Sequence, residues 1–511
     1  GKGGNGGSID IKNYGDITTK FGAIVGQSLG SGGGIAFANS NLPTSLKFGG
    51  ETINNSQGVS SKVDIYNYSK IRVTGSNSIG IIGQSVGGGG GLVFTNTATD
   101  FNVVGSSNYN IANNISVNNS GSISMDSANS IAVFAQSNGG VAGTIVANTN
   151  NQAFNNGHLG PIWNISLAGP GRSGDISILN TGTISATGEN STGIVAQNTK
   201  STVITDGNLQ TYGVIKITNG STENRTAQII GGTGNGVAIA LIGNTQSTVT
   251  NYGSILSSSG RTGIAIYSDY GNATVNNFGT ITGKINLGGV ASTNKIITEP
   301  GSTWNVTGEY AGAVVNKGLM KFNSGDAETS VITGSIENYG IHSFSSGSNV
   351  ANVITGSVEN YGIHSLSSGS HVATSIVNGN YFSSRNSILV VKTDLDPAAD
   401  QLRVTGSANI ASAVAVNIAD PGAAYPGVHS HVIIHADGGL TDSGMSLQTP
   451  QSAVISHNIA SGANDTVLSY TVNFAPVGMT KNQNAIGNNV NSIQLMQQAP
   501  LFPAFKPVAA A

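Results

Sequence analysis

The sequence lacks several features that mark common classes of protein. It contains no cysteine, which excludes a disulfide framework and metal sites built from thiolates. Charged residues make up only 9% of its 511 residues, against about 25% in an average soluble domain. No apolar run approaches the ~20 residues of a membrane-spanning helix. The surface must therefore consist mainly of short, uncharged polar side chains.

The few charges are also scattered, with 21 Lys and Arg residues and a net charge of −3. Nothing in this pattern could neutralise a row of phosphates, so we expect no nucleic-acid partner. Glycine, by contrast, is abundant at 73 residues, roughly twice its usual share. A chain of this length would ordinarily form about three or four domains. A repeat architecture is the alternative, since each repeat packs only on its neighbours.

Internal repeats are the strongest signal in the sequence. Residues Val331–Asn352 and Val353–Thr374 are consecutive copies that differ at only four positions. A looser phrase, apolar–x–apolar–x–Asn–x–Gly–x–Ile, recurs earlier in the chain. Its copies are Ile9–Ile17, Ile115–Ile123, Ile176–Ile184 and Ala273–Ile281, and in Val63–Ile71 the glycine is replaced by Ser69. The alternation predicts half-buried strands, and Asn and Gly predict a tight turn with left-handed backbone angles between them.

A second, glycine-rich phrase follows the first at a fixed distance. Its copies are Gly22–Gly34, Gly80–Gly91, Ile131–Gly140 and Gly193–Asn198. The offset from the turn asparagine to the glutamine is the same in three copies: Asn67 to Gln84, Asn119 to Gln136 and Asn180 to Gln197. A constant offset predicts that both phrases recur at fixed angles around a coil, with the glycine runs as loops at one corner. We therefore expect an all-β fold, a right-handed parallel β-helix.

The pattern of apolar and polar residues changes after about residue 375. Strands are predicted at Ala411–Ile418, His431–Ile434 and Val467–Phe474. Thr480 is expected to cap a short linker helix over residues 481–498, in which Ile486, Val490, Ile493 and Met496 share one face. The predicted organisation is a repeat stem over 1–375, a closing β region over 376–476, and the linker helix with a Pro/Ala tail over 477–511.

These motifs resemble the passenger region of bacterial autotransporters that carry an outer-membrane β-barrel. The resemblance rests on Gly80–Gly91 and on the C-terminal segments Asp400–Gly406, Val432–Gly439, Tyr470–Phe474 and Met479–Ala485. It implies export to the surface of a Gram-negative cell or release from it, with folding seeded by an autochaperone-like region at 376–476. The family's C-terminal barrel, the expected partner, does not follow in this sequence. Passengers include adhesins, aggregation factors, proteases and esterases, so the fold alone names no activity.

Three patterns resemble catalytic or metal-binding motifs, but for each of them we favour a structural explanation. Gly26–Gly30 and Gly83–Gly87 match G-x-S-x-G, but without a neighbouring helix we interpret them as structural turns. His342 and His364 occupy equal positions of the repeat, as do Glu337 and Glu359; we expect a column of equivalent side chains rather than a metal site. Asp10 and Asp64 occupy the same position of the repeat phrase, but no cluster of Asp and Arg residues, as a polysaccharide-cleaving β-helix would need, recurs on one strand face. We therefore predict no catalytic, metal or cofactor-binding residues.

Aromatic residues follow the turn asparagine in several repeats. We expect them to stack over one corner, and the candidate ligand-facing stack comprises Tyr252, Phe278, Tyr339 and Tyr361, with Tyr14 and Tyr68 in the same phase. The predicted function is a non-catalytic adhesin or structural stalk that binds glycans, matrix or neighbouring cells as a monomer or by self-association. Two alternatives stay open: a carbohydrate-active β-helix enzyme, and a spacer for a binding unit outside this sequence.

Overall fold

The computed structural model describes most of the chain. The described residues are 5–30, 33–38, 47–48, 58–88, 90–95, 102–103, 110–139, 142–147, 162–166, 171–198, 204–205, 208–209, 213–243, 246–269, 272–288, 293–323, 330–345, 352–366, 372–393, 399–418, 426–449 and 452–496. They form two compact units, the first over 1–297 and 302–304 and the second over 298–301 and 305–511. The predicted boundary at residue 375 lies inside the second unit.

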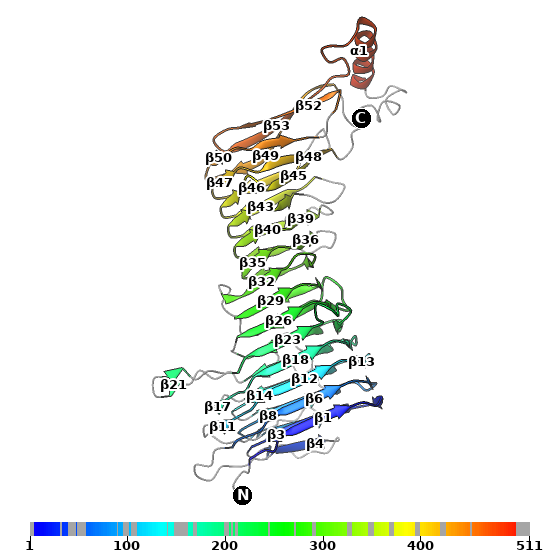
Figure 1. Ribbon diagram of the computed structural model, residues 1–511, viewed down its shortest axis with the longest axis vertical. Coiled ribbons are helices and arrows are strands. Elements are labelled where there is room, and N and C mark those ends of the chain that lie inside the picture. The colour runs from blue at the N-terminus through cyan, green and yellow to red at the C-terminus, as the bar shows by residue number, and fades with distance from the viewer. Residues whose placement is uncertain are drawn as a thin grey trace. The chain divides into compact units, whose positions relative to one another are not determined.

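The first unit is a parallel β-helix, as predicted, in which each coil adds one strand to each of three sheets (Figure 1). The first sheet contains β1 (Ile9–Asn13), β6 (Val63–Asn67), β12 (Ile115–Asn119), β18 (Ile176–Asn180), β23 (Ile215–Asn219), β26 (Ser247–Asn251) and β29 (Ala273–Asn277). The second contains β2 (Ile17–Thr19), β7 (Lys70–Val73), β13 (Ser122–Met125), β19 (Thr183–Ala186), β24 (Gln228–Gly231), β27 (Ser254–Ser257) and β30 (Thr280–Thr282). The third contains β3 (Gly22–Leu29), β8 (Ile79–Val86), β14 (Ile131–Asn138), β20 (Thr192–Asn198), β25 (Val237–Ile242), β28 (Ile264–Ser268) and β31 (Lys284–Asn286).

The repeat phrases stack in register, which confirms the predicted coil. Val63 pairs with Ile115, which pairs with Ile176, and all three are buried in the core. The glutamines of the second phrase stack as well, and Gln84 lies between Gln27 and Gln136. Inward Ile and Val columns cover the inner faces of the sheets, which a parallel sheet requires. The fixed sequence offset therefore did indicate fixed angular positions.

The turn asparagines form a buried hydrogen-bonded column. Each side-chain Nδ2 donates to the Oδ1 of the asparagine in the next coil, over 2.7–2.9 Å, through Asn13, Asn67, Asn119, Asn180, Asn219, Asn251 and Asn277. Asn67 through Asn277 are at most 1% exposed. Because an amide carries both a donor and an acceptor, an uninterrupted column satisfies most of its own hydrogen-bonding groups. The asparagine is thus a core residue of the turn.

The predicted left-handed angles at the phrase asparagine and glycine were wrong. Among the described residues, the asparagines with positive φ are Asn77, Asn129, Asn190 and Asn272, and the phrase glycines are not among the positive-φ glycines. Glycine is needed for a different reason, the close approach of the preceding coil. A Cβ on Gly121 would lie 1.9 Å from the carbonyl oxygen of Ser69, and one on Gly182 would lie 1.9 Å from that of Gly121.

Ser69, which replaces the glycine in one coil, has a specific compensation. Its hydroxyl donates to Asp16 Oδ1 over 2.6 Å, and the backbone N–H of Lys70 donates to the same oxygen over 3.1 Å. In the next coils this backbone bond runs to a carbonyl oxygen, as from Ser122 N–H to Ser69. The two bonds from Ser69 and Lys70 lower the pKa of Asp16. A side-chain acceptor therefore replaces a backbone acceptor where the glycine is missing.

The glycine runs were predicted to be loops, and this expectation was wrong for part of them. Residues after the third-sheet strands form a separate sheet of β4 (Gly33–Ala38), β9 (Gly90–Thr95), β15 (Ala142–Ala147) and β16 (Ile162–Ser166). The first three pair in parallel and β16 pairs antiparallel to β15. Short pairs complete the insertions: β5 (Lys47–Phe48) with β10 (Asn102–Val103), β11 (Asn110–Ile111) with β17 (Gly171–Arg172), and β21 (Ile204–Thr205) with β22 (Asn208–Leu209). Successive insertions therefore pair like the coils that carry them.

The second unit is also a parallel β-helix, and β32 (Lys295–Thr298) and β33 (Thr303–Val306) lie where the sequence passes between the units. Its first sheet contains β35 (Ala313–Asn316), β38 (Ile336–Asn338), β41 (Val358–Asn360), β44 (Tyr381–Ser383), β47 (Ala408–Ile410) and β50 (Leu440–Asp442). Its second contains β36 (Leu319–Asn323), β39 (Ile341–Ser345), β42 (Ile363–Ser365), β45 (Ile388–Thr393), β48 (Ala413–Ile418) and β51 (Ser446–Gln448). Its third contains β34 (Glu309–Ala311), β37 (Val331–Thr333), β40 (Asn352–Thr355), β43 (Thr374–Asn378), β46 (Gln401–Val404), β49 (Gly427–Ala436), β53 (Asp465–Val472) and β52 (Ile455–Ser461).

The last three strands of that third sheet close the unit with antiparallel pairing, since β53 pairs antiparallel to both β49 and β52. The helix α1 (Lys481–Leu495) follows and ends three residues before the predicted bound of 498. Thr480 caps it, as predicted, and does so through a capping box with Gln483. The predicted apolar face is only partly used. Val490 packs with Tyr470 and Phe474, whereas Ile486 is 65% and Met496 68% exposed. Gly487 is buried instead. It lies so close to the preceding segment that a Cβ there would be 2.2 Å from the carbonyl oxygen of Phe474.

Candidate functional site

The aromatic residues predicted to face a ligand form separate stacked pairs at one corner of the coils. Tyr339 and Tyr361 stack with centroids 4.9 Å apart and ring planes 9° apart. Tyr252 and Phe278 stack at 4.7 Å and 14°, and Tyr14 and Tyr68 at 4.8 Å and 8°. In the coils between Tyr68 and Tyr252 the position is taken by Ser120, Thr181 and Gly220. The stack is thus a series of pairs rather than a continuous column.

The asparagine column explains where these rings point. Each ring follows an asparagine of the column, buried in every case except the half-buried Asn13, so the chain turns outward immediately after a residue that is fixed by its hydrogen bonds. In the second unit, Asn316, Asn338 and Asn360 form such a column, with Nδ2 to Oδ1 distances of 2.7 Å. The rings that follow are exposed, Tyr339 by 51% and Tyr361 by 36%. Stacking covers the facing sides of the two rings, so the Tyr339–Tyr361 pair offers ring edges and hydroxyl oxygens to solvent.

Carboxylates accompany the Tyr339–Tyr361 pair. The hydroxyl of Tyr361 donates to Glu359 Oε2 over 2.9 Å, and that of Tyr339 to Glu337 Oε2 over 3.4 Å. Glu359 raises the pKa of Tyr361 through this hydrogen bond, because loss of the phenolic proton would place a second negative charge beside the carboxylate. Partial burial, followed by the charge of Glu337, raises the pKa of Tyr339. Both phenols therefore stay protonated as donors well above neutral pH.

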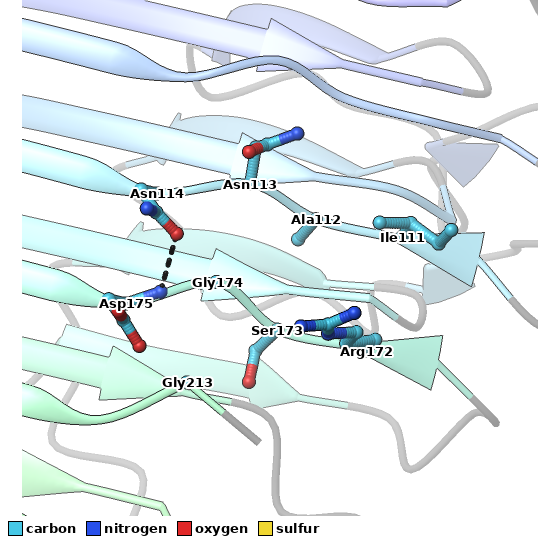
Figure 2. A pocket seen from close by; sticks show the side chains of 9 residues that line it. All are labelled: Ile111, Ala112, Asn113, Asn114, Arg172, Ser173, Gly174, Asp175 and Gly213. Atoms are coloured by element: carbon cyan, nitrogen blue, oxygen red, sulfur yellow. Dashed lines mark hydrogen bonds between the residues drawn. The ribbon is translucent and has the colours of Figure 1, made fainter. Parts of the chain in front are cut away.

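A polar hollow lies elsewhere in the first unit, where the insertions return to the coils (Figure 2). It has a volume of about 500 Å³ and is lined by Ile111, Ala112, Asn113, Asn114, Arg172, Ser173, Gly174, Asp175 and Gly213. Much of its polar lining is already used by the fold. Asn114 Oδ1 accepts the backbone N–H of Asp175 over 2.9 Å, and Asp175 Oδ1 accepts that of Val214 over 2.8 Å. These side chains therefore hold successive coils together.

The hydrolase-like motifs lie in strands, not in the structural turns that the sequence analysis expected. Ser28 is part of β3 and Ser85 part of β8, and both are at most 1% exposed. The Ser28 hydroxyl accepts the N–H of Ser61 over 2.7 Å, and the Ser85 hydroxyl contacts that of Ser60 at 2.8 Å. Both serines bind the segment that leads into β6, inside the coil, and a nucleophile elbow needs the opposite, an exposed hydroxyl at a strand-to-helix turn.

Two carboxylates that share a phase in the sequence are direct neighbours in the fold. Asp10 and Asp64 are register partners on β1 and β6. Each pairs with a lysine: Lys12 Nζ lies 3.5 Å from Asp10, and Lys62 Nζ lies 2.9 Å from Asp64. Sequence reasoning treated them as separate, although the common phase was the signal that joins them. Within the described residues, no group of three His, Cys, Asp or Glu side chains is arranged to hold a metal ion.

A scan of known protein families finds no family model that matches the chain, and a search of curated proteins finds no match. In the part of the chain that the structure describes, no helix is both long and apolar enough to cross a membrane.

Proposed function

We propose that this chain is the exported, non-catalytic passenger of an autotransporter-like protein, acting at or near the cell surface as an adhesive stem. The observation that supports the proposal best is the set of stacked aromatic pairs that follow the turn asparagines, of which Tyr14–Tyr68 and Tyr339–Tyr361 are exposed and Tyr252–Phe278 is half-buried. Weak sites repeated along a rigid support add up when one extended ligand contacts several of them. The autotransporter resemblance of the sequence supplies the surface location and the barrel partner.

The geometry of the pairs favours one type of ligand contact. A sugar that stacks on an aromatic residue needs an open ring face, and stacking covers the inner faces of each pair. What remains open in each pair is the ring edges, 4.7–4.9 Å apart between partners, and the tyrosine oxygens, which can accept hydrogen bonds while Tyr339 and Tyr361 donate their own protons to Glu337 and Glu359. Such an edge fits a neutral, hydroxyl-rich or amide-rich polymer that lies against the pair, because the carboxylates of Glu337 and Glu359 beside it would repel an anionic polymer.

A binding screen on glycan and extracellular-matrix arrays tests the proposal. The unmodified chain should bind at least one polymer saturably. The variant Tyr339→Ala/Tyr361→Ala should bind it about tenfold more weakly or not at all, because it loses both the edge contacts and the phenolic oxygens. The variant Tyr339→Phe/Tyr361→Phe keeps the stack and separates the two contributions. Thr248→Ala/Thr250→Ala on β26, which changes a sheet face without aromatic pairs, should bind normally.

Two results would contradict the adhesive stem. One is full binding by the alanine variant, which would move the binding surface to another part of the chain. The other is no binding to any polymer by a chain whose circular dichroism shows folded β-structure, which favours a spacer.

A carbohydrate-active enzyme is the second candidate, because Asp10 and Asp64 lie side by side with lysines. Paired carboxylates are the usual acid–base groups for glycosidic bonds. Each of these carboxylates, however, is neutralised by its own lysine. Turnover of a polysaccharide that Asp64→Asn abolishes, with the fold intact, would establish the enzyme and overturn the stem.

A further inference from the structure

Two histidines lie in the core of the second unit. His342 on β39 and His364 on β42 are register partners in adjacent coils, and neither is exposed. Their rings stack with centroids 4.5 Å apart and planes 6° apart. The same inward column holds Met320 before the pair and Leu389 after it. Two polar rings therefore occupy positions that neighbouring coils fill with apolar side chains.

Within the part of the chain that the structure describes, no negatively charged group near the pair would compensate a positive charge on either imidazole ring. Phe322 and Phe344 pack on His342, with centroids 5.0 and 4.7 Å away. The hydroxyl of Tyr381 lies 2.9 Å from His364 Nδ1. Both ring nitrogens of His342, and Nε2 of His364, have no hydrogen-bond partner. The titratable groups that face the pair are the two rings themselves and Tyr381, and no carboxylate among the described residues acts on either ring.

The consequence for stability has a definite sign. Burial lowers the pKa of His364 to about 3, and burial together with the charge of His364 holds the pKa of His342 well below its usual value. An unfolded histidine titrates near 6.5. Below that pH the two histidines bind protons in the unfolded chain but stay neutral in the folded core, so the folded state loses stability as pH falls. Above about pH 7 both rings are neutral in either state and the effect is absent.

We propose that the stacked pair His342–His364 makes the second unit an acid-operated switch, in which the coil segments 330–345 and 352–366 are folded at neutral pH and unfold locally on acidification. The first unit contains no histidine among its described residues and provides an internal reference. Two other histidines of the second unit, His435 and His457, lie outside these coils, and their pKa values shift in opposite directions. Asp465 and Asp437, both hydrogen-bonded to His435, raise the pKa of that ring, so its protonation stabilises the fold. His457 is half-buried, and burial lowers its pKa in the same sense as for the core pair.

Hydrogen exchange of the full chain, read by mass spectrometry at pH 7 and about pH 5, tests the switch. After correction for intrinsic exchange, peptides from 331–366 should lose protection by at least about tenfold on acidification. Peptides from the first unit should change little. The variant His342→Met/His364→Leu uses residue types from the same column and should abolish most of the acid response. His457→Phe should leave the response of 331–366 in place.

Proton counting keeps the proposal testable if the double variant folds poorly. Urea unfolding of the second unit across this pH range gives the number of protons taken up on unfolding, from the slope of stability against pH. His342→Met should lower that number by about one and the double variant by about two. An unchanged slope in His342→Met, or acid opening of the first unit in parallel with the second, would overturn the switch.

Discussion

Replacing Asn119 with aspartate should destabilise the first unit by about 4 kcal/mol at neutral pH. Asn119 is 1% exposed, accepts from Asn67 and donates to Asn180 Oδ1 over 2.8 Å. Aspartate keeps the acceptor but turns a second, charged oxygen toward the acceptor atom of Asn180. Burial beside acceptors raises a carboxyl pKa by about 3 units, and each unit corresponds to about 1.4 kcal/mol. Urea unfolding, with hydrogen exchange to identify first-unit peptides, measures the loss.

The adjacent residue provides a matched control. Asn118 is on the outward side of the same strand, half-buried, and donates to Ser116 Oγ over 3.1 Å. Asn118→Asp should change stability by no more than about 0.5 kcal/mol. A protonated aspartic acid imitates part of the amide, so the Asn119→Asp defect should shrink as pH falls toward about 4. Equal effects at the two positions, or a defect that does not depend on pH, would show that the asparagine column is not what stabilises the turn.

Replacing Gly182 with alanine should cost about 3 kcal/mol, near the upper end for overpacking. The added methyl group would lie 1.9 Å from the carbonyl oxygen of Gly121 in the preceding coil. No rotamer can relieve the contact, since Cβ is fixed by the backbone. The coil must move away, which weakens the parallel hydrogen bonds beside it, such as Thr183 N–H to the Gly121 carbonyl oxygen at 3.1 Å. The midpoint of urea unfolding measures the effect.

Gly15 is the control for the glycine column. It occupies the same phrase position, but a Cβ there would meet nothing within 4 Å. Gly15→Ala should be neutral or stabilising by about 0.5 kcal/mol, because alanine restricts the unfolded chain. If Gly15→Ala proves as damaging as Gly182→Ala, the turn requires glycine for backbone flexibility, and the close approach of coils is not the cause.

The fold was largely predictable because its signals are periodic and local. Alternation in Ile115–Asn119 and its counterparts gives strands, and the constant offset from Asn119 to Gln136 gives the coil. The aromatic pairs followed from the same reasoning, since equal positions in successive coils become neighbours. The strands within the glycine runs were missed because glycine and small residues carry little pattern, and their pairing depends on insertions from different coils.

The sequence also did not predict which side chains near the ends of the repeats point into the core. In β39 the sequence Ile341–His342 would ordinarily bury the isoleucine, yet Ile341 is 40% exposed and His342 is buried. The preceding coil decides this, because Met320 and Phe322 of β36 already face inward and β39 pairs with β36 in register. A shift by one residue would turn every side chain of the strand to the other face. The asparagine column, which is fixed a few residues earlier at Asn338, prevents that shift.

The sequence by itself determined the architecture, the coil repeat and the capped C-terminal helix, because each depends on residues that are close together in the chain. Tertiary structure alone decided why glycine is needed at Gly121 and Gly182, that Asp10 lies beside Asp64, and that two imidazoles are enclosed without a counter-charge. Each of these depends on which coil lies above and which below. That relation joins residues up to 64 positions apart, and it forms only when parallel strands stack about 4.8 Å from one another.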